Sequence, residues 1–272
     1  MLKQRLIVGA IGAVFMIAVL LADVRIISLV VGIMAVIGLS EIYNATGFLK
    51  KQNKLCLFTY IYTLVMYIVI GFLPKAGTTI AAFVFIYIVL LFIYMMFNQE
   101  SCDFSAICSL TFQFIYVSVF FAHVILVRKL EFGEFIMWFI FVTAWLSDTM
   151  AYAVGLKFGR NKLIPSISPK KTIEGAIGGL AGSLIFNLIY ALICSTAFDL
   201  NVNYFAVVVL AIVAGVVSQF GDLAASSIKR EYNLKDYSNL LPGHGGILDR
   251  FDSVLFVAPI VYYFVVIFPV IA

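Results

Sequence analysis

The sequence predicts an all-α polytopic integral membrane protein with about nine transmembrane helices. Hydrophobic residues make up 64% of the 272 residues, charged residues make up 12%, and the mean hydropathy is +1.10. Soluble domains are roughly 45–50% apolar and about 25% charged. The apolar residues also gather into runs close to the roughly 20 residues that a helix needs to cross a bilayer. Together these observations indicate helices that face lipid and one another.

Nine apolar runs account for this fold class. The first two are short and are joined by the tight link Asp23-Val24-Arg25, so they form either a hairpin or a partly inserted pair. The expected spans are residues 6–22, 26–42, 55–73, 78–97, 104–127, 135–155, 173–194, 204–228 and 254–271. We interpret the chain as one membrane domain with hydrophobic N-terminal helices in 1–130. For residues 131–272 we expect the helices and cytoplasmic loops that would carry any catalytic residues, for the reasons that follow.

The distribution of basic residues predicts the orientation in the cell membrane. With nine spans and the N-terminus inside, 14 of the 18 Lys and Arg residues fall in inner segments, including Lys3 and Arg5. Cytoplasmic segments carry such an excess. The long polar loops 157–172 and 229–253 are then cytoplasmic, and so is the site they carry. The net charge of +4 lies in these loops, which favours anionic headgroups or phosphate ligands and no nucleic acid.

Acidic residues converge on the same inner face. Asp148 and Asp222 lie inside predicted spans, Glu174 begins the seventh, and Asp249 and Asp252 precede the ninth. A carboxylate at the centre of a membrane helix costs about 2.5–3.5 kcal/mol on insertion scales. Each acid alone could pair with a neighbouring cation or reach the interface. Five of them at one depth indicate an oxygen-rich site that suits Mg²⁺.

The segment PGHGGILDRFDS places two of these acids at helical spacing. Asp249 and Asp252 are three residues apart, so they share one helix face and can approach one ion. Gly245 and Gly246 leave room for a phosphate and permit unusual backbone angles, and free backbone N–H groups at a helix start can meet an anion. His244 either bonds that phosphate or caps the turn.

The segment SPKKTIEG is expected to begin the seventh helix. Ser168 would be the capping residue and Pro169 the first helical residue. Lys170 and Lys171 would then lie in the first turn, where they oppose the helix dipole unless an anion binds there. Alternatively they are plain positive-inside anchors. Further along, the pairs Gly175/Gly179 and Gly178/Gly182 predict close packing against another helix.

A third polar group follows Asp222. Ser226 and Arg230 continue the same helix face at intervals of four residues, and Lys229 lies beside them. This stripe is a candidate ligand-facing line.

Several of these segments resemble one known family. The residues SSIKR (226–230), Lys235-Asp236 and PGHGGILDRFD (242–252) resemble the C-terminal motif of the phosphatidate cytidylyltransferases, or CDP-diacylglycerol synthases. The segments SDTMAYAVGLKFGR and SPKKTIEG are also similar to that family. The resemblance implies a membrane enzyme, often a homodimer, that makes CDP-diacylglycerol and pyrophosphate from CTP and phosphatidic acid with Mg²⁺. It implies Asp222 and Asp249 as metal ligands, with Asp252 close by.

These residues suggest a mechanism as a hypothesis. Metal at Asp222, Asp249 and Asp252 would bridge phosphoryl oxygens, Asp148 would support the metal or orient a lysine, and basic side chains would neutralise the triphosphate and pyrophosphate. Those basic residues are Lys170, Lys171, Lys229, Arg230 and Arg250. The alternatives are a CTP-dependent polyprenol kinase and a cation or phosphate transporter, although no inverted repeat of the transporter kind is visible.

Overall fold

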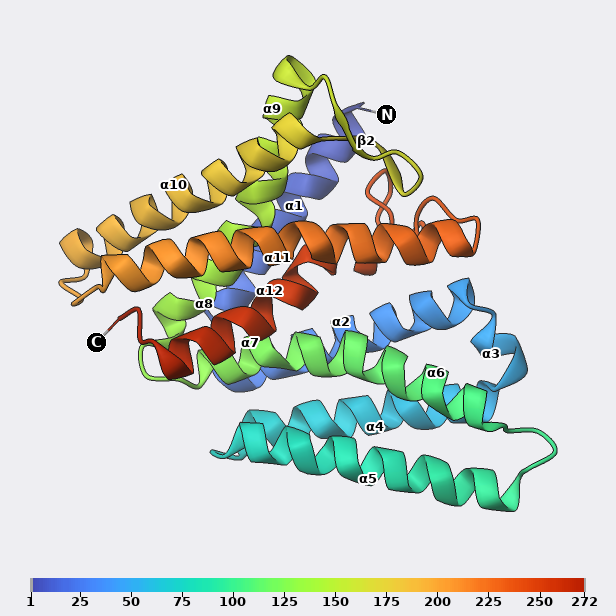
Figure 1. Ribbon diagram of the computed structural model, residues 1–272. Coiled ribbons are helices and arrows are strands. Elements are labelled where there is room, and N and C mark those ends of the chain that lie inside the picture. Colours follow the sequence, from blue (N-terminus) through green and yellow to red (C-terminus); the bar gives the residue numbers. More distant parts are fainter. Residues whose placement is uncertain (1, 272) are drawn as a thin grey trace. The chain divides into compact units, whose positions relative to one another are not determined.

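The computed structural model describes residues 2–271, with side chains from residue 9 onward (Figure 1). Lys3 and Arg5, which enter the predicted orientation, lie outside the described side chains. The helices are α1 (Leu2–Leu20), α2 (Val24–Ala45), α3 (Phe48–Lys51), α4 (Asn53–Phe72), α5 (Ala76–Phe97), α6 (Phe104–Phe114), α7 (Phe120–Arg128), α8 (Gly133–Phe141), α9 (Ser147–Phe158), α10 (Ile173–Ala197), α11 (Tyr204–Glu231) and α12 (Leu248–Ile267).

Eight continuous helical stretches in the described part of the chain are long and apolar enough to cross a membrane. Two of them contain a π-helical segment, Ile115–Val119 between α6 and α7 and Val142–Leu146 between α8 and α9. The first predicted span corresponds to α1, in which the shorter stretch Gly9–Leu20 is apolar. The all-α polytopic prediction is thus confirmed. The last predicted span began too late, because α12 starts at Leu248.

The chain divides into two compact units. The first contains Met1–Lys129 together with the loop Asp236–Asp249, and the second contains Leu130–Lys235 and Arg250–Ala272. In the first unit α2 packs on α4 at glycines: a Cβ added to Gly32 would lie 2.8 Å from the Cβ of Tyr67. The Ser28 hydroxyl donates to the Tyr67 carbonyl oxygen at 2.6 Å, so this contact also satisfies a buried polar group.

In the second unit α9 and α10 lie side by side, and α11 packs on α10 (Figure 1). The predicted close packing of the glycine pairs is confirmed. A Cβ on Gly178 would lie 2.5 Å from the Cβ of Val154, and one on Gly182 would lie 2.6 Å from the Cβ of Met150. The helices approach so closely because the glycines of α10 present no side chain to Val154 and Met150 of α9.

The segment before α10 forms a hairpin, which corrects the expectation for Ser168. Strand β1 (Lys162–Ile164) pairs antiparallel with β2 (Ser168–Thr172). The helix begins four residues later than predicted, at Ile173, because the Thr172 hydroxyl accepts from the Gly175 N–H at 3.1 Å and caps it. Lys170 and Lys171 therefore lie on a strand and not in the first turn of a helix.

Candidate active site

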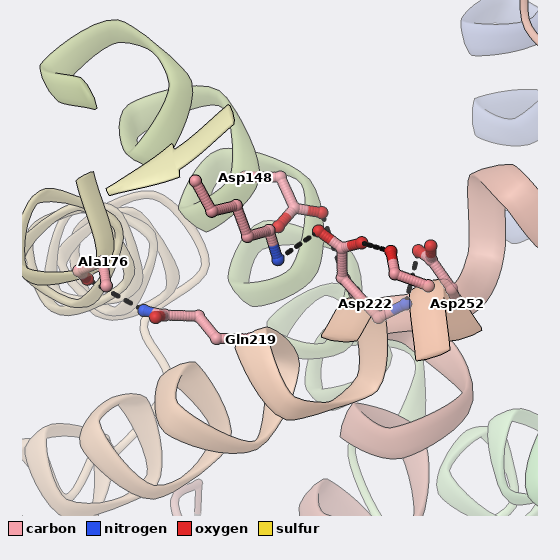
Figure 2. Close-up of polar contacts among 8 residues, drawn as sticks. Asp148, Ala176, Gln219, Asp222 and Asp252 are labelled. Carbon is pink, nitrogen blue, oxygen red and sulfur yellow. Dashed lines mark hydrogen bonds and ion pairs between the residues drawn. The ribbon is translucent and has the colours of Figure 1, made fainter. Parts of the chain in front are cut away.

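Three aspartates of the second unit point toward one region, as Figure 2 shows. Asp148 lies on α9, Asp222 on α11 and Asp252 on α12. Asp222 is partly exposed, whereas Asp252 is buried. Because they come from three helices separated by long stretches of sequence, only the packing of the unit brings their carboxylates together.

Serines hold these carboxylates in place. The Ser253 hydroxyl donates to Asp148 Oδ2 at 3.1 Å, and the Ser253 backbone N–H donates to Asp252 Oδ1 at 2.8 Å. Ser226 donates to Asp222 Oδ1 at 3.3 Å, which places the predicted Asp222–Ser226 pair on one face of α11. These three hydrogen bonds fix the orientation of the carboxylates relative to α11 and α12.

Lys171 on β2 forms an ion pair with Asp222 on α11, drawn as a dashed line to Asp222 in Figure 2. The side chains are 25% and 26% exposed, so the pair is neither fully buried nor freely solvated. The strand, rather than a helix turn, carries Lys171 to this position. Without a ligand, a cation beside the acids lowers the repulsion between them. When a phosphate binds there, the same cation can neutralise the phosphate.

A cavity of about 600 Å³ opens beside this ion pair within the second unit. Its cations are Lys162, Lys170 and Lys171, and Asp148 and Asp222 form its acidic wall. The remaining lining residues are mostly small or apolar: Ala151, Tyr152, Gly155, Leu156, Gly159, Leu163, Thr172, Gly175, Ala176 and Gln219. Tyr152 and Leu156 are exposed. The cavity thus combines three lysines with exposed apolar surface at Tyr152 and Leu156, a combination that suits an amphiphile that carries a phosphate.

Sequence reasoning did not predict most of the lining residues, and Gln219 and Lys162 are the two whose chemistry matters most here. Gln219 donates from Nε2 to the Ala176 carbonyl oxygen at 2.9 Å, and it lies one turn before Asp222 on α11 (Figure 2). Its polarity inside an apolar span and its three-residue spacing from Asp222 are the signals that could have identified it. Lys162 lies on β1, and only the hairpin brings it to the cavity.

The other predicted residues of this unit have separate contacts. Arg230 donates from Nε to the Ile167 carbonyl oxygen at 3.2 Å and from Nη1 to the Leu234 carbonyl oxygen at 2.7 Å, so it supports the turn of the hairpin. Lys229 is buried, and its charge acts on Asp252. Arg250 is exposed.

Glu174 contacts the turn after α9. It accepts hydrogen bonds from the backbone N–H groups of Arg160 and Asn161 at 3.1 and 3.2 Å. The Asn161 side chain donates to the same carboxylate at 2.8 Å. Its carboxylate is thus used to fix the end of α9 rather than to line the cavity.

Asp249 belongs to the first unit and organises the glycine-rich loop there. Its Oδ2 accepts from the backbone N–H groups of Tyr237 at 2.8 Å and Gly246 at 2.9 Å. Gly245 has φ of +84°, a conformation that glycine adopts without strain. His244 donates its backbone N–H to the Leu241 carbonyl oxygen at 2.8 Å, so it closes the turn. Whether its ring meets a phosphate stays a prediction.

The acids provide the oxygen donors that Mg²⁺ prefers. Among the described residues, however, three or more His, Cys, Asp or Glu side chains are nowhere grouped so that they could hold a metal ion. Asp222 is paired with Lys171 instead. Asp148, Asp222 and Asp252 thus have suitable donor atoms without being gathered around one ion in this structure, and the metal stays a prediction.

These features define the class of protein: an integral membrane protein in which acids and lysines line one cavity. The chain belongs to the cytidylyltransferase family, whose sequence profile matches residues 3–268. It is 30% identical over 273 residues to the phosphatidate cytidylyltransferase of Bacillus subtilis, covering 98% of both chains. It is 32% identical to that of Thermotoga maritima, covering 96% of this chain and 95% of the other. A Staphylococcus haemolyticus phosphatidate cytidylyltransferase is 46% identical over 122 residues, 45% of each chain.

Proposed function

We propose that the protein is a nucleotidyltransferase that transfers CMP from CTP to phosphatidic acid, giving CDP-diacylglycerol and pyrophosphate for phospholipid synthesis. The observation that carries the proposal is the similarity over nearly the whole chain to two proteins named phosphatidate cytidylyltransferase. The family match and the eight long apolar helices agree with an enzyme that acts on a lipid in the cell membrane.

The reaction needs positioning and charge neutralisation more than acid–base chemistry. The phosphate monoester of phosphatidic acid is largely ionised near neutral pH, since comparable monoesters have a second pKa of about 6. One of its oxygens attacks the α-phosphorus of CTP, and the bond between the α-phosphorus and its bridging oxygen to the β-phosphorus breaks. Pyrophosphate leaves with that electron pair. A dedicated general base is therefore unnecessary.

The repulsion between two anionic substrates is the main obstacle that the protein must overcome. Lys162, Lys170 and Lys171 place three positive charges around one cavity, and fixed charges that neutralise phosphoryl oxygens stabilise the transition state. Lys171 would exchange its contact with Asp222 for a substrate phosphate. Tyr152 and Leu156, which line the cavity and are exposed, would let the acyl chains stay in the bilayer while the headgroup enters.

Mg²⁺ is part of this proposal. When bound, the ion would neutralise charge on the triphosphate and the leaving pyrophosphate. Within the second unit Asp222 and Asp252 would hold it, with Asp148 beside them. The family resemblance also implies Asp249 as a ligand; in this structure Asp249 belongs to the first unit and orders its own loop, and Asp249→Asn tests the implied role.

The orientation and the assembly complete the proposal. The N-terminus and the loops 157–172 and 229–253 would face the cytoplasm, as the distribution of basic residues indicates. CTP would then reach the site directly. The family resemblance favours a homodimer, which cross-linking in native membranes would detect. Cysteine labelling of loop residues in sealed vesicles would report the orientation.

A product assay tests the reaction and separates it from the kinase alternative. The purified full-length protein is incubated with phosphatidic acid, Mg²⁺ and CTP labelled at either the α- or the γ-phosphate. We expect the α-label in a lipid whose mass is that of CDP-diacylglycerol. Label from the γ-phosphate in a lipid product formed from polyprenol, with no α-label in lipid, would instead establish the kinase. No labelled lipid with either substrate would contradict both.

A further inference from the structure

Glu41 is a buried carboxylate that sequence reasoning did not consider. It lies on α2 in the first unit and is only 4% exposed. Its Oε1 accepts from the Ser238 hydroxyl at 2.7 Å and from the Ile247 backbone N–H at 2.9 Å. Its Oε2 accepts from the Leu248 backbone N–H at 2.9 Å. Each bond joins residues about 200 positions apart in the sequence.

These bonds satisfy the start of α12. The first N–H groups of a helix have no partner within the helix, and a carboxylate there is also favoured by the helix dipole. Leu248 is the first residue of α12, and Glu41 supplies the acceptor for its N–H from another helix. Hydrogen bonds to a charged group are stronger than bonds between neutral groups, so Glu41 restrains both the loop and the first turn of α12.

Gly246 makes this approach possible. A Cβ at residue 246 would lie 2.3 Å from Glu41 Oε1, so any side chain there would displace the carboxylate. The second glycine of the pair is thus needed for the contact with Glu41 in this structure, where sequence reasoning expected room for a phosphate.

Glu41 and Asp249 divide three successive amides between them. Asp249 Oδ2 accepts from the Gly246 N–H, and Glu41 accepts from the N–H groups of Ile247 and Leu248. Both carboxylates belong to the first unit. Loss of either carboxylate would loosen the same short stretch of backbone, because the amides that they bind belong to three consecutive residues.

We propose that Glu41 is a positioning residue for the reaction: it holds residues 246–248 so that Asp249 keeps its place and orientation. This inference rests on the proposed function, in which the Asp249 charge takes part. Glu41 itself is not a catalytic residue, since its carboxylate is occupied by the protein's own donors. The N-terminal helices thereby contribute to a motif that lies near the other end of the chain.

Glu41→Gln tests the proposal in the full-length protein. Glutamine keeps the volume and one acceptor oxygen, but its amide nitrogen opposes an N–H donor. We expect kcat to fall about 10- to 100-fold, the usual range for residues that orient metal-site side chains. The Mg²⁺ concentration for half-maximal turnover should rise several-fold. A smaller fraction of folded protein would lower the rate without moving that concentration.

Hydrogen exchange supplies a readout that does not depend on turnover. The amides of residues 246–248 should exchange faster in Glu41→Gln than in wild type. Glu100→Gln, an exposed glutamate in the turn after α5, is the matched control and should change neither exchange nor turnover. Ser238→Ala removes one of the three bonds, so its effect should be smaller. Combined with Glu41→Gln it should add little, because both changes remove the same bond.

The proposal fails if Glu41→Gln keeps wild-type kcat and wild-type exchange at residues 246–248. It also fails if kcat falls while the Mg²⁺ dependence stays unchanged, which would indicate a purely structural role. A wild-type preparation that makes no CDP-diacylglycerol would count against the proposed function. The exchange comparison would still decide whether Glu41 holds the loop.

Discussion

Gly178→Ala is the sharpest stability prediction from the packing of α9 on α10. The added methyl carbon would lie 2.5 Å from the Cβ of Val154 and 2.6 and 2.7 Å from its two methyl groups. Ordinary contacts between carbon atoms are about 3.5–4.0 Å. The two helices would therefore have to separate by about 1 Å at this point, because the Cβ of Val154 is fixed to the backbone and cannot rotate away.

The expected cost follows from two opposing effects. Overpacking of this kind costs about 1–3 kcal/mol, and the rigid contact with Val154 favours the upper half of that range. Replacing a helical glycine by alanine stabilises the helix by about 1 kcal/mol through helix propensity. We expect a net loss of about 1–2 kcal/mol in the free energy of unfolding. At about 2–4 °C per kcal/mol for domains of 150–250 residues, the midpoint should fall by about 2–8 °C.

Thermal unfolding in detergent, followed by tryptophan fluorescence, measures this loss. Gly12→Ala is the matched control, because a Cβ at that helical position would meet nothing within 4 Å. It should leave the midpoint unchanged or slightly higher. The reasoning would be refuted if Gly178→Ala and Gly12→Ala had the same midpoint. Lower turnover is also expected for Gly178→Ala, since α9 and α10 both line the cavity.

Three further predictions concern the chemistry. EDTA should stop turnover and Mg²⁺ restore it, measured by CDP-diacylglycerol formation; full turnover in chelator would exclude a metal role. Asp249→Asn should abolish turnover, because the charge is lost. The amount of protein in the membrane should stay near normal, because asparagine still accepts from the Tyr237 and Gly246 amides. Wild-type activity would rule out a role for the charge. Lys171→Gln should raise KM for the anionic substrates about tenfold. Lys50 is exposed on α3, so Lys50→Gln should leave KM unchanged. Equal KM values for the two variants would show that Lys171 does not bind substrate.

The membrane helices could be predicted from sequence because their physical cause is local. An apolar run of about 20 residues must form a helix in lipid, since every backbone polar group needs a partner there. The same holds for the glycine pairs of α10 and for Asp222 with Ser226, which depend only on helical spacing. These features needed no knowledge of distant contacts.

The start of α10 shows where local reasoning stops. Ser168 and Thr172 are both good capping residues. Pro169 favoured a helix start after Ser168, because proline is common at the first helical position. Pairing of β2 with β1 decides between them, because the strand occupies Ser168–Thr172 and leaves Thr172 to cap the helix. The partner strand lies outside the window that a capping rule considers.

The cavity and the loop depend on contacts that sequence spacing does not encode. Lys162 joins the cavity only through the hairpin, and Glu41 meets the amide of Leu248 across 207 residues. A glutamate in the C-terminal half of the apolar helix α2 was nevertheless a signal, since such a group is costly in lipid unless it has partners. It passed unnoticed because the N-terminal helices otherwise looked purely hydrophobic.

The chain passes from one unit to the other three times, at residues 129/130, 235/236 and 249/250. Exchanging N-terminal helices with a relative at a single junction near residue 130 would separate Glu41 from the amides that it binds in this chain. Chimaeras should therefore move residues 1–129 and 236–249 as one cassette. Truncations that keep only the C-terminal half would retain the DRFD segment but lose Glu41, whose hydrogen bonds hold the residues before that segment.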